Sequence, residues 1–179
     1  MRKLISIQRL DSLFLCPSSE VFRRIALLAI AVAFALTTVS ARAEGNDTAA
    51  VLAANARFYS ALDKMFAGDV SSMEQVWSHA DDVTYMGPTG NFQHGWSAVL
   101  KDWEGQAAQK LGGKVEPTGI QVMVGRDLAV VNDYEQGENT NAQGKVMPVK
   151  LRATNIFRKE DGQWKMVGHH TDQLSYLTH

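Results

Sequence analysis

The feature that most constrains the fold is a change in hydrophobic period near Lys114. Before this residue, apolar side chains recur three and four positions apart, as on one face of a helix. After it they alternate with polar ones, as Ile120, Val122 and Val124 do. Helices followed by an unbroken run of strands indicate an α+β fold. We therefore expect three N-terminal helices packed on one face of a curved, mainly antiparallel sheet.

Capping and turn residues set the expected bounds of these elements. The first helix should begin at Asn46-Asp47-Thr48 and stop at Gly68, and Asp69 should cap a short second helix. The third helix should end at Gly112-Gly113. A short strand over 81–86 and a turn over 87–90 are expected between the second and third helices, and four longer strands over 114–124, 128–135, 146–158 and 163–173.

The first 43 residues are typical of a secretory signal peptide. Arg23-Arg24 precede an apolar run over 25–36, and Ala41-Arg42-Ala43 supplies a small-x-small cleavage site. Cleavage there would leave a domain over 44–179, in the periplasm or secreted. The twenty residues before Val21 are unusual for such a peptide, which suggests that translation begins at the Val21 codon. Mass spectrometry of the precursor tests this start, and a peptide covering residues 4–19 would exclude it.

Charge and cysteine content narrow the function of the predicted domain. It holds 12 basic and 17 acidic residues, because the first 43 residues contain 6 of the 18 basic and 2 of the 19 acidic ones. A net charge of −5 without a basic stripe argues against nucleic-acid binding. After cleavage no membrane segment is expected. The single cysteine, Cys16, precedes the domain, which therefore has neither a disulfide nor a cysteine nucleophile.

The C-terminal motifs resemble a known family. The strand Arg152-Ala153-Thr154-Asn155-Ile156-Phe157-Arg158, the turn Asp161-Gly162 and the strand 163–170 ending in His169-His170 are similar to the terminal hairpin of the SnoaL-like branch of the nuclear transport factor 2-like superfamily. Tyr85-Met86-Gly87-Pro88 leading to Gly95-Trp96 fits the same pattern. The resemblance implies a cone-shaped fold with a pocket between the sheet and the first helix. Its members include isomerases, dehydratases, cyclases and proteins without an assigned reaction, so the fold does not fix the function.

The pairing of the last two strands decides which side chains face this pocket. A three-residue loop, Glu160-Asp161-Gly162, would place Arg152 opposite His170, on one face with Thr154 and Trp164. A two-residue Asp-Gly turn would instead place His170 opposite Ala153. We favour the first register, because it gathers polar groups and apolar walls on one side, as a binding pocket does. Arg152 beside His170 would suit a carboxylate or an enolate.

Other candidate residues follow from their positions in the predicted elements. Asp133, in the middle of a strand, would be a general base if buried. Tyr85 and Tyr59 are candidate hydrogen-bond donors in the pocket, and Trp96 is a candidate ligand contact on the third helix. Five histidines without H-x-H or H-x-x-x-H spacing predict no metal site. No cofactor motif is present.

Two functions remain open on these observations. One is a cofactor-free isomerase, dehydratase or cyclase acting on a small carbonyl compound, with His170 or Asp133 transferring the proton and Tyr85 or Arg152 stabilising the oxyanion. The other is a non-catalytic domain that binds a small molecule or associates with itself. We expect a homodimer, because the outer face of a curved open sheet exposes apolar surface.

Overall fold

The computed structural model describes residues 47–141 and 143–173. The predicted signal peptide, the alternative start and Cys16 lie outside these residues and stay predictions. The described part of the N-terminal helix covers residues 47–66. The other elements are α2 (Ser71–Val76), β1 (Thr84–Met86), β2 (Phe92–His94), α3 (Trp96–Ala108), β3 (Lys114–Val124), β4 (Leu128–Thr140), β5 (Val146–Glu160) and β6 (Gln163–Gln173).

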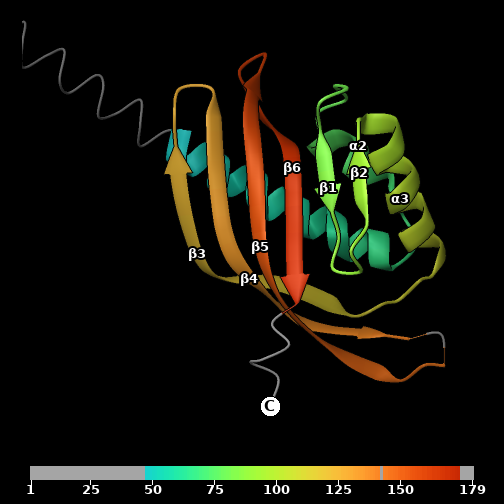
Figure 1. The fold of residues 1–179 in the computed structure, drawn as a ribbon. Helices are drawn as coiled ribbons and strands as arrows, with labels where there is room; N and C mark the ends of the chain where they lie inside the picture. Colours follow the sequence, from blue (N-terminus) through green and yellow to red (C-terminus); the bar gives the residue numbers. More distant parts are fainter. Residues whose placement is uncertain (1–46, 142, 174–179) are drawn as a thin grey trace, which may run out of the picture. The chain divides into compact units, whose positions relative to one another are not determined.

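The strands form one six-stranded sheet in the order β2-β1-β6-β5-β4-β3. All neighbours pair antiparallel except β1 and β6, which are parallel. The sheet is not closed, and its edges are β2 and β3. The N-terminal helix crosses one face of the sheet, and α3 lies beside β2 (Figure 1). The predicted α+β class, with three helices on a curved, mainly antiparallel sheet, is confirmed. The strand β2, which was not predicted, forms a short hairpin with β1.

The helical stripe read from the sequence is the buried face of the N-terminal helix. Val51, Phe58 and Met65 are fully buried, and the polar Asn55 and Tyr59 lie buried among them. Gly68 follows the helix with φ of 101°, a left-handed conformation that favours glycine. Two polar side chains on an otherwise apolar helix face therefore point into the interior, where they require hydrogen-bond partners.

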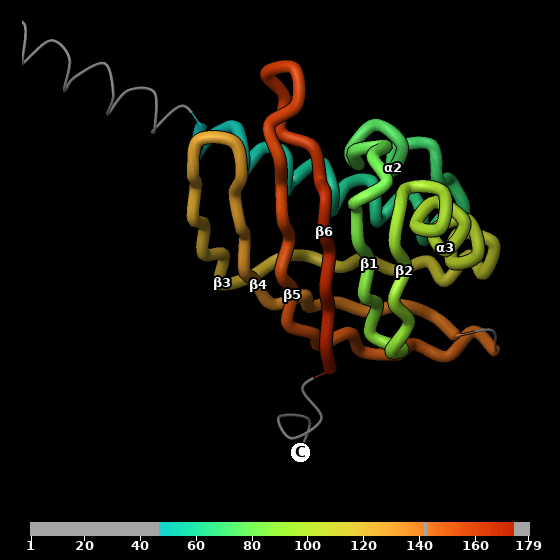
Figure 2. Tube along the Cα trace, turned by 45° about the horizontal axis from the view of Figure 1, so that its top comes forward, coloured from blue at the N-terminus to red at the C-terminus, as the bar shows by residue number. Residues whose placement is uncertain are grey.

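The long hairpin of β4 and β5 bends away from the rest of the sheet. Its far end extends beneath β1, β2 and α3, as Figures 1 and 2 both show. Residues near this end, Asn139 and Val149, consequently face the same hollow as Gln109 and Leu111, which follow α3. The bent end of the hairpin therefore forms one wall of this hollow.

The observed pairing of β5 with β6 differs from the register that we favoured. Asp161 and Gly162 both have positive φ, 48° and 78°, and form a two-residue turn that pairs Glu160 with Gln163. The three-residue loop was therefore wrong. A register shift after Phe157 then moves the pairing by one more residue, so His170 lies opposite Thr154, not opposite Arg152 or Ala153.

The observed pairing places His169, and not His170, on the inner face of the sheet. His169 is buried opposite Asn155 on the inner face, whereas His170 is exposed on the outer face. Arg152 is also exposed there. Because side chains alternate along a strand, a shift of one residue reassigns each of them.

Candidate functional site

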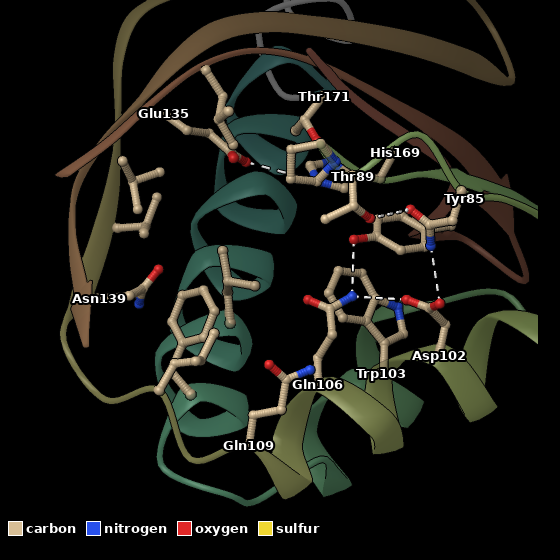
Figure 3. A pocket seen from close by; sticks show the side chains of 18 of the residues that line it. Tyr85, Thr89, Asp102, Trp103, Gln106, Gln109, Glu135, Asn139, His169 and Thr171 are labelled. Atoms are coloured by element: carbon tan, nitrogen blue, oxygen red, sulfur yellow. Dashed lines mark hydrogen bonds and ion pairs between the residues drawn. The ribbon is translucent and has the colours of Figure 1, made fainter. Parts of the chain in front are cut away.

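A cavity of about 1200 Å³ lies between the helices and the inner face of the sheet. Its apolar wall includes Leu62, Phe66, Trp103, Leu111 and Val115. Its polar lining includes Tyr85, Gln106, Glu135, His169 and Thr171 (Figure 3). An apolar chamber with a few converging polar groups is the usual form of a small-molecule site.

Two acidic residues of β4 lie on the inner face of the sheet. Asp133 and Glu135 are two positions apart in the strand, and both are buried. Burial and the neighbouring Asp133 raise the pKa of Glu135 to about 8. Burial also raises the pKa of Asp133, against hydrogen bonds from Tyr59 and Asn55 that lower it. Glu135, which lines the cavity, can therefore carry or release a proton close to neutral pH.

Tyr59 of the N-terminal helix links the two carboxyl groups. Its hydroxyl oxygen lies 2.8 Å from Asp133 Oδ1 and 3.2 Å from Glu135 Oε1. One hydroxyl hydrogen can be donated to only one of them, and the shorter contact favours Asp133. A protonated Glu135 can then donate to the Tyr59 oxygen. Burial, followed by Glu135 and Asp133, raises the pKa of Tyr59, so the phenol keeps its proton.

The hydrogen bonds of Asn155 assign the tautomer of His169. Asn155 Nδ2 donates to Asn55 Oδ1 at 2.9 Å, which leaves its Oδ1 to accept from His169 Nδ1 at 2.6 Å. Neutral His169 therefore presents the lone pair of Nε2, which lies 3.7 Å from Glu135 Oε1. Burial, and to a lesser extent His170, lowers the pKa of His169 to about 3, so the ring is neutral at physiological pH.

Stacked rings hold His169 in place within the cavity wall. The centroid of its ring lies 5.7 Å from that of the Tyr85 ring, with 5° between the two planes. It lies 4.7 Å from the centroid of the Phe58 ring. The Trp103 ring lies 4.5 Å from Tyr85 on another side. Tyr85 is buried, which raises the pKa of its hydroxyl, while a hydrogen bond from Gln106 lowers it. Both polar rings are thus fixed by packing, a requirement for a preorganised site.

Two polar groups in the cavity wall have no hydrogen-bond partner among the described residues. Thr171 is 3% exposed and Trp103 is 1% exposed, yet Thr171 Oγ1 and Trp103 Nε1 are both unpaired. An unpaired buried polar atom costs roughly 1–3 kcal/mol, and few are tolerated without a reason. Both atoms are covered by neighbouring protein atoms, so they stand behind the cavity surface and do not present a donor to it.

The residues nominated from the sequence divide into two sets. Tyr85 lines the cavity, and Asp133 and Tyr59 lie directly behind Glu135. Against the favoured register, Arg152 and His170 lie on the outer sheet face, with Thr154 beside them. Arg152 forms an ion pair with Asp172, and Thr154 Oγ1 accepts a hydrogen bond from Asn132 at 2.9 Å.

The two nominated tryptophans lie away from the cavity lining. Trp164 is buried beneath Lys159, whose Nζ lies 5.5 Å from the ring centroid. Trp96 stacks on His79 at 4.6 Å between ring centroids. Both are consistent with packing.

Sequence reasoning missed Glu135, His169 and Thr171. The signal for Glu135 was present, because Ala129, Val131, Asp133 and Glu135 alternate along one strand and must share a face. His169 and Thr171 depended on the register shift, for which the sequence carries no clear mark. Among residues 47–141 and 143–173, no three His, Cys, Asp or Glu side chains are grouped as metal ligands. No helix of this described region has the length and hydropathy to cross a membrane.

Comparison with known proteins supplies relatives of this fold. Residues 51–174 match the SnoaL-like domain family. A structure of a candidate dehydratase of the NTF2-like family from Streptomyces avermitilis superposes with a TM-score of 0.66 at 25% identity, covering 73% of this chain and 98% of that one. A candidate aromatic ring hydroxylase from Novosphingobium aromaticivorans gives a TM-score of 0.62 at 18% identity, covering 72% and 90%. No curated protein sequence matched the chain.

Proposed function

Since the chain belongs to the SnoaL-like domain family, we propose that its cavity binds a small, largely apolar molecule carrying a carbonyl oxygen, and that Glu135 transfers a proton to or from it. The observation that carries this proposal is a buried carboxyl group whose pKa is raised to about 8 and which lines an apolar cavity. A group that titrates near the working pH is suited to general acid–base catalysis. The similarity to a candidate dehydratase supports a reaction of this class.

The surrounding groups support a defined sequence of proton movements. The Glu135 carboxylate would take a proton from the carbon next to the carbonyl, leaving the electron pair on an enolate oxygen. The hydroxyl group of Tyr85 would donate a hydrogen bond to that oxygen. Return of the proton to another carbon gives an isomerase. Departure of a β-hydroxyl group as water, with the proton carried by Glu135, gives a dehydratase. Neither route requires a cofactor.

Hydrogen–deuterium exchange tests the proton transfer without knowledge of the natural substrate. The full chain would be incubated in D₂O with 2-tetralone, a bicyclic ketone with acidic hydrogens next to its carbonyl, and deuterium incorporation followed by NMR. We expect catalysed exchange, and a loss of about 10²–10⁴-fold in Glu135→Gln, since removal of a general base typically costs that much.

Glu138→Gln is the matched control, because Glu138 is an exposed residue of the same strand. It should exchange at the wild-type rate. Saturable binding of 2-tetralone without exchange would contradict the catalytic proposal and favour a non-catalytic binding domain. Equal exchange by wild type and Glu135→Gln would assign the base elsewhere.

We also propose that the domain forms a homodimer through the outer face of the sheet. Three large apolar side chains of β3 and β4 are exposed on this face: Met123 at 62%, Leu128 at 51% and Tyr134 at 45%. A second copy presenting the same surface would bury them in a symmetric interface. This association is compatible with either function of the cavity, which opens on the other side of the sheet.

A further inference from the structure

We propose that Asp102 and Gln106 of α3 orient the Tyr85 hydroxyl so that it donates its hydrogen to a ligand oxygen, which makes the cavity selective for hydrogen-bond acceptors. Neither residue is expected to exchange protons with the ligand. They act through Tyr85 and are positioning residues. The inference rests on the proposed function in one respect, that the cavity is the ligand site.

The orientation begins with the side-chain amide of Gln106. Its Nε2 lies 2.9 Å from the Tyr85 hydroxyl oxygen and 2.8 Å from Asp102 Oδ2 (Figure 3). Asp102 and Gln106 are four residues apart on α3 and therefore adjacent on its surface. The two hydrogens of the amide nitrogen are thus both used, one toward the carboxylate and one toward the phenol.

Asp102 is what prevents the amide from turning over. If Gln106 turned, its oxygen would face the Asp102 carboxylate, and two acceptors would oppose each other. Asp102 is itself held by Asn91 Nδ2, which donates to Oδ1 at 2.9 Å, and by Gln93 Nε2 at 3.4 Å. Three amide groups from two segments of the chain therefore fix the carboxylate, and the carboxylate fixes the direction of the Gln106 amide.

This arrangement determines where the single hydroxyl hydrogen of Tyr85 can be donated. Because its oxygen accepts from Gln106, this hydrogen has to be donated elsewhere, and within the described residues no acceptor for it is found. The backbone of Gly87 approaches the hydroxyl so closely that an added Cβ would lie 2.6 Å from it. His169 and Trp103 cover the ring. The remaining direction is the cavity that Tyr85 lines.

Without this arrangement, Tyr85 would lose its donor role. A turned Gln106 would present its amide oxygen to the phenol and accept the hydrogen that a ligand needs. The amide cluster therefore favours ketones, esters and other acceptors over molecules of the same shape that lack an oxygen. A buried donor left unpaired discriminates strongly against such molecules.

Paired probes measure this selectivity directly. 2-Tetralone and tetralin share a bicyclic carbon skeleton and differ in the carbonyl oxygen, and their dissociation constants for the full chain would be measured by NMR titration. We expect wild type to prefer 2-tetralone, and Tyr85→Phe to reduce that preference by roughly 3–10-fold, as one hydrogen bond provides.

Gln106→Glu tests the orienting role. The introduced carboxyl group lies against Asp102 and shares a proton with it, and its oxygen accepts the Tyr85 hydrogen. The preference for 2-tetralone should therefore fall about as far as in Tyr85→Phe, and the double variant should lose no more. Gln121→Glu is the matched control, since Gln121 is exposed on β3 at a distance from the cavity lining. It should keep the wild-type preference.

A second measurement needs no ligand. The ¹³Cζ resonance of Tyr85 should shift in Gln106→Glu and not in Gln121→Glu, because the phenol changes from acceptor to donor only in the former. Equal shifts, or binding of both probes with an unchanged preference in Tyr85→Phe, would overturn the orienting role and leave the cavity as a binding site. Failure of both probes to bind would overturn the ligand site itself, and the inference with it.

Discussion

At the scale of single residues, Glu135 and His169 make stability depend on pH in opposite directions. Native Glu135 keeps its proton up to about pH 8, whereas the unfolded carboxyl loses it near 4.5, so stability falls as pH rises through this window. Native His169 stays neutral down to about pH 3, whereas the unfolded imidazole takes a proton below 6.5, so stability falls as pH drops. The two effects offset each other between 4.5 and 6.5.

Above pH 6.5 the imidazole is neutral in both the folded and the unfolded state. Of these two groups, only Glu135 still makes stability depend on pH there. We expect the free energy of unfolding to fall by about 1.4 kcal/mol per pH unit from this group between 6.5 and 8. Denaturant titrations at several pH values measure the slope, and Glu135→Gln should abolish it. A slope that persists in Glu135→Gln would show that another group binds the proton.

The same residues show where sequence reasoning ends. Asp133 could be singled out as a charge inside an apolar strand, and alternation places Glu135 beside it. The sequence does not give the raised pKa of Glu135, because that depends on the burial of both carboxyl groups beneath a helix 70 or more residues earlier in the chain. His170 was chosen over His169 for a related reason, since only the three-dimensional pairing tells the two neighbours apart.

At the scale of elements, the residue just before β3 packs closely against β4. Gly113 has φ of 77°, and an added Cβ would lie 1.9 Å from the backbone oxygen of Glu138. We expect Gly113→Ala to lower the free energy of unfolding by about 3 kcal/mol, because backbone strain and the clash act together. Chemical denaturation followed by tryptophan fluorescence measures the loss.

Gly144 separates the two causes. It has a similar φ of 74° but no atom within 4 Å of an added Cβ, so Gly144→Ala carries the conformational cost alone, about 1 kcal/mol. The difference between the two variants isolates the contact between the strands. Equal losses would mean that the strands separate at Gly113 without cost.

The terminal hairpin shows how far element-level prediction reaches. Asp161-Gly162 marked the turn, and both strands were predicted within a few residues of their ends. The predicted register was wrong for two reasons. The turn has two residues and not three, and the pairing shifts by one residue near Phe157. A bulge of this kind is set by the twist and packing of the sheet, so local sequence does not reveal it. The short strand β2 was not predicted, because three residues are too few to show an alternating pattern.

At the scale of the whole molecule, the class of fold was the most predictable property. The change from helical to alternating period is a sum over many residues, and no single position can reverse it. The cavity follows from the same architecture, since an amphipathic helix laid across a curved sheet cannot fill the space at its centre. What the cavity contains depends on individual side chains of β1, α3, β4 and β6, and therefore on the register of each strand.

The outer face of the sheet gives the prediction that belongs to the assembled protein. Met123 and Tyr134 lie on neighbouring strands, and a lysine at both positions would put charge at the centre of the proposed interface, where desolvation makes it costly. We expect light scattering to report a dimer for wild type and a monomer for the double variant Met123→Lys, Tyr134→Lys, with an unchanged unfolding midpoint at low concentration. Met147→Lys is the control, because Met147 is exposed at 43% near the far end of the β4–β5 hairpin. A wild-type mass equal to one chain, or a Met147→Lys variant that dissociates as well, would exclude this face as the site of association.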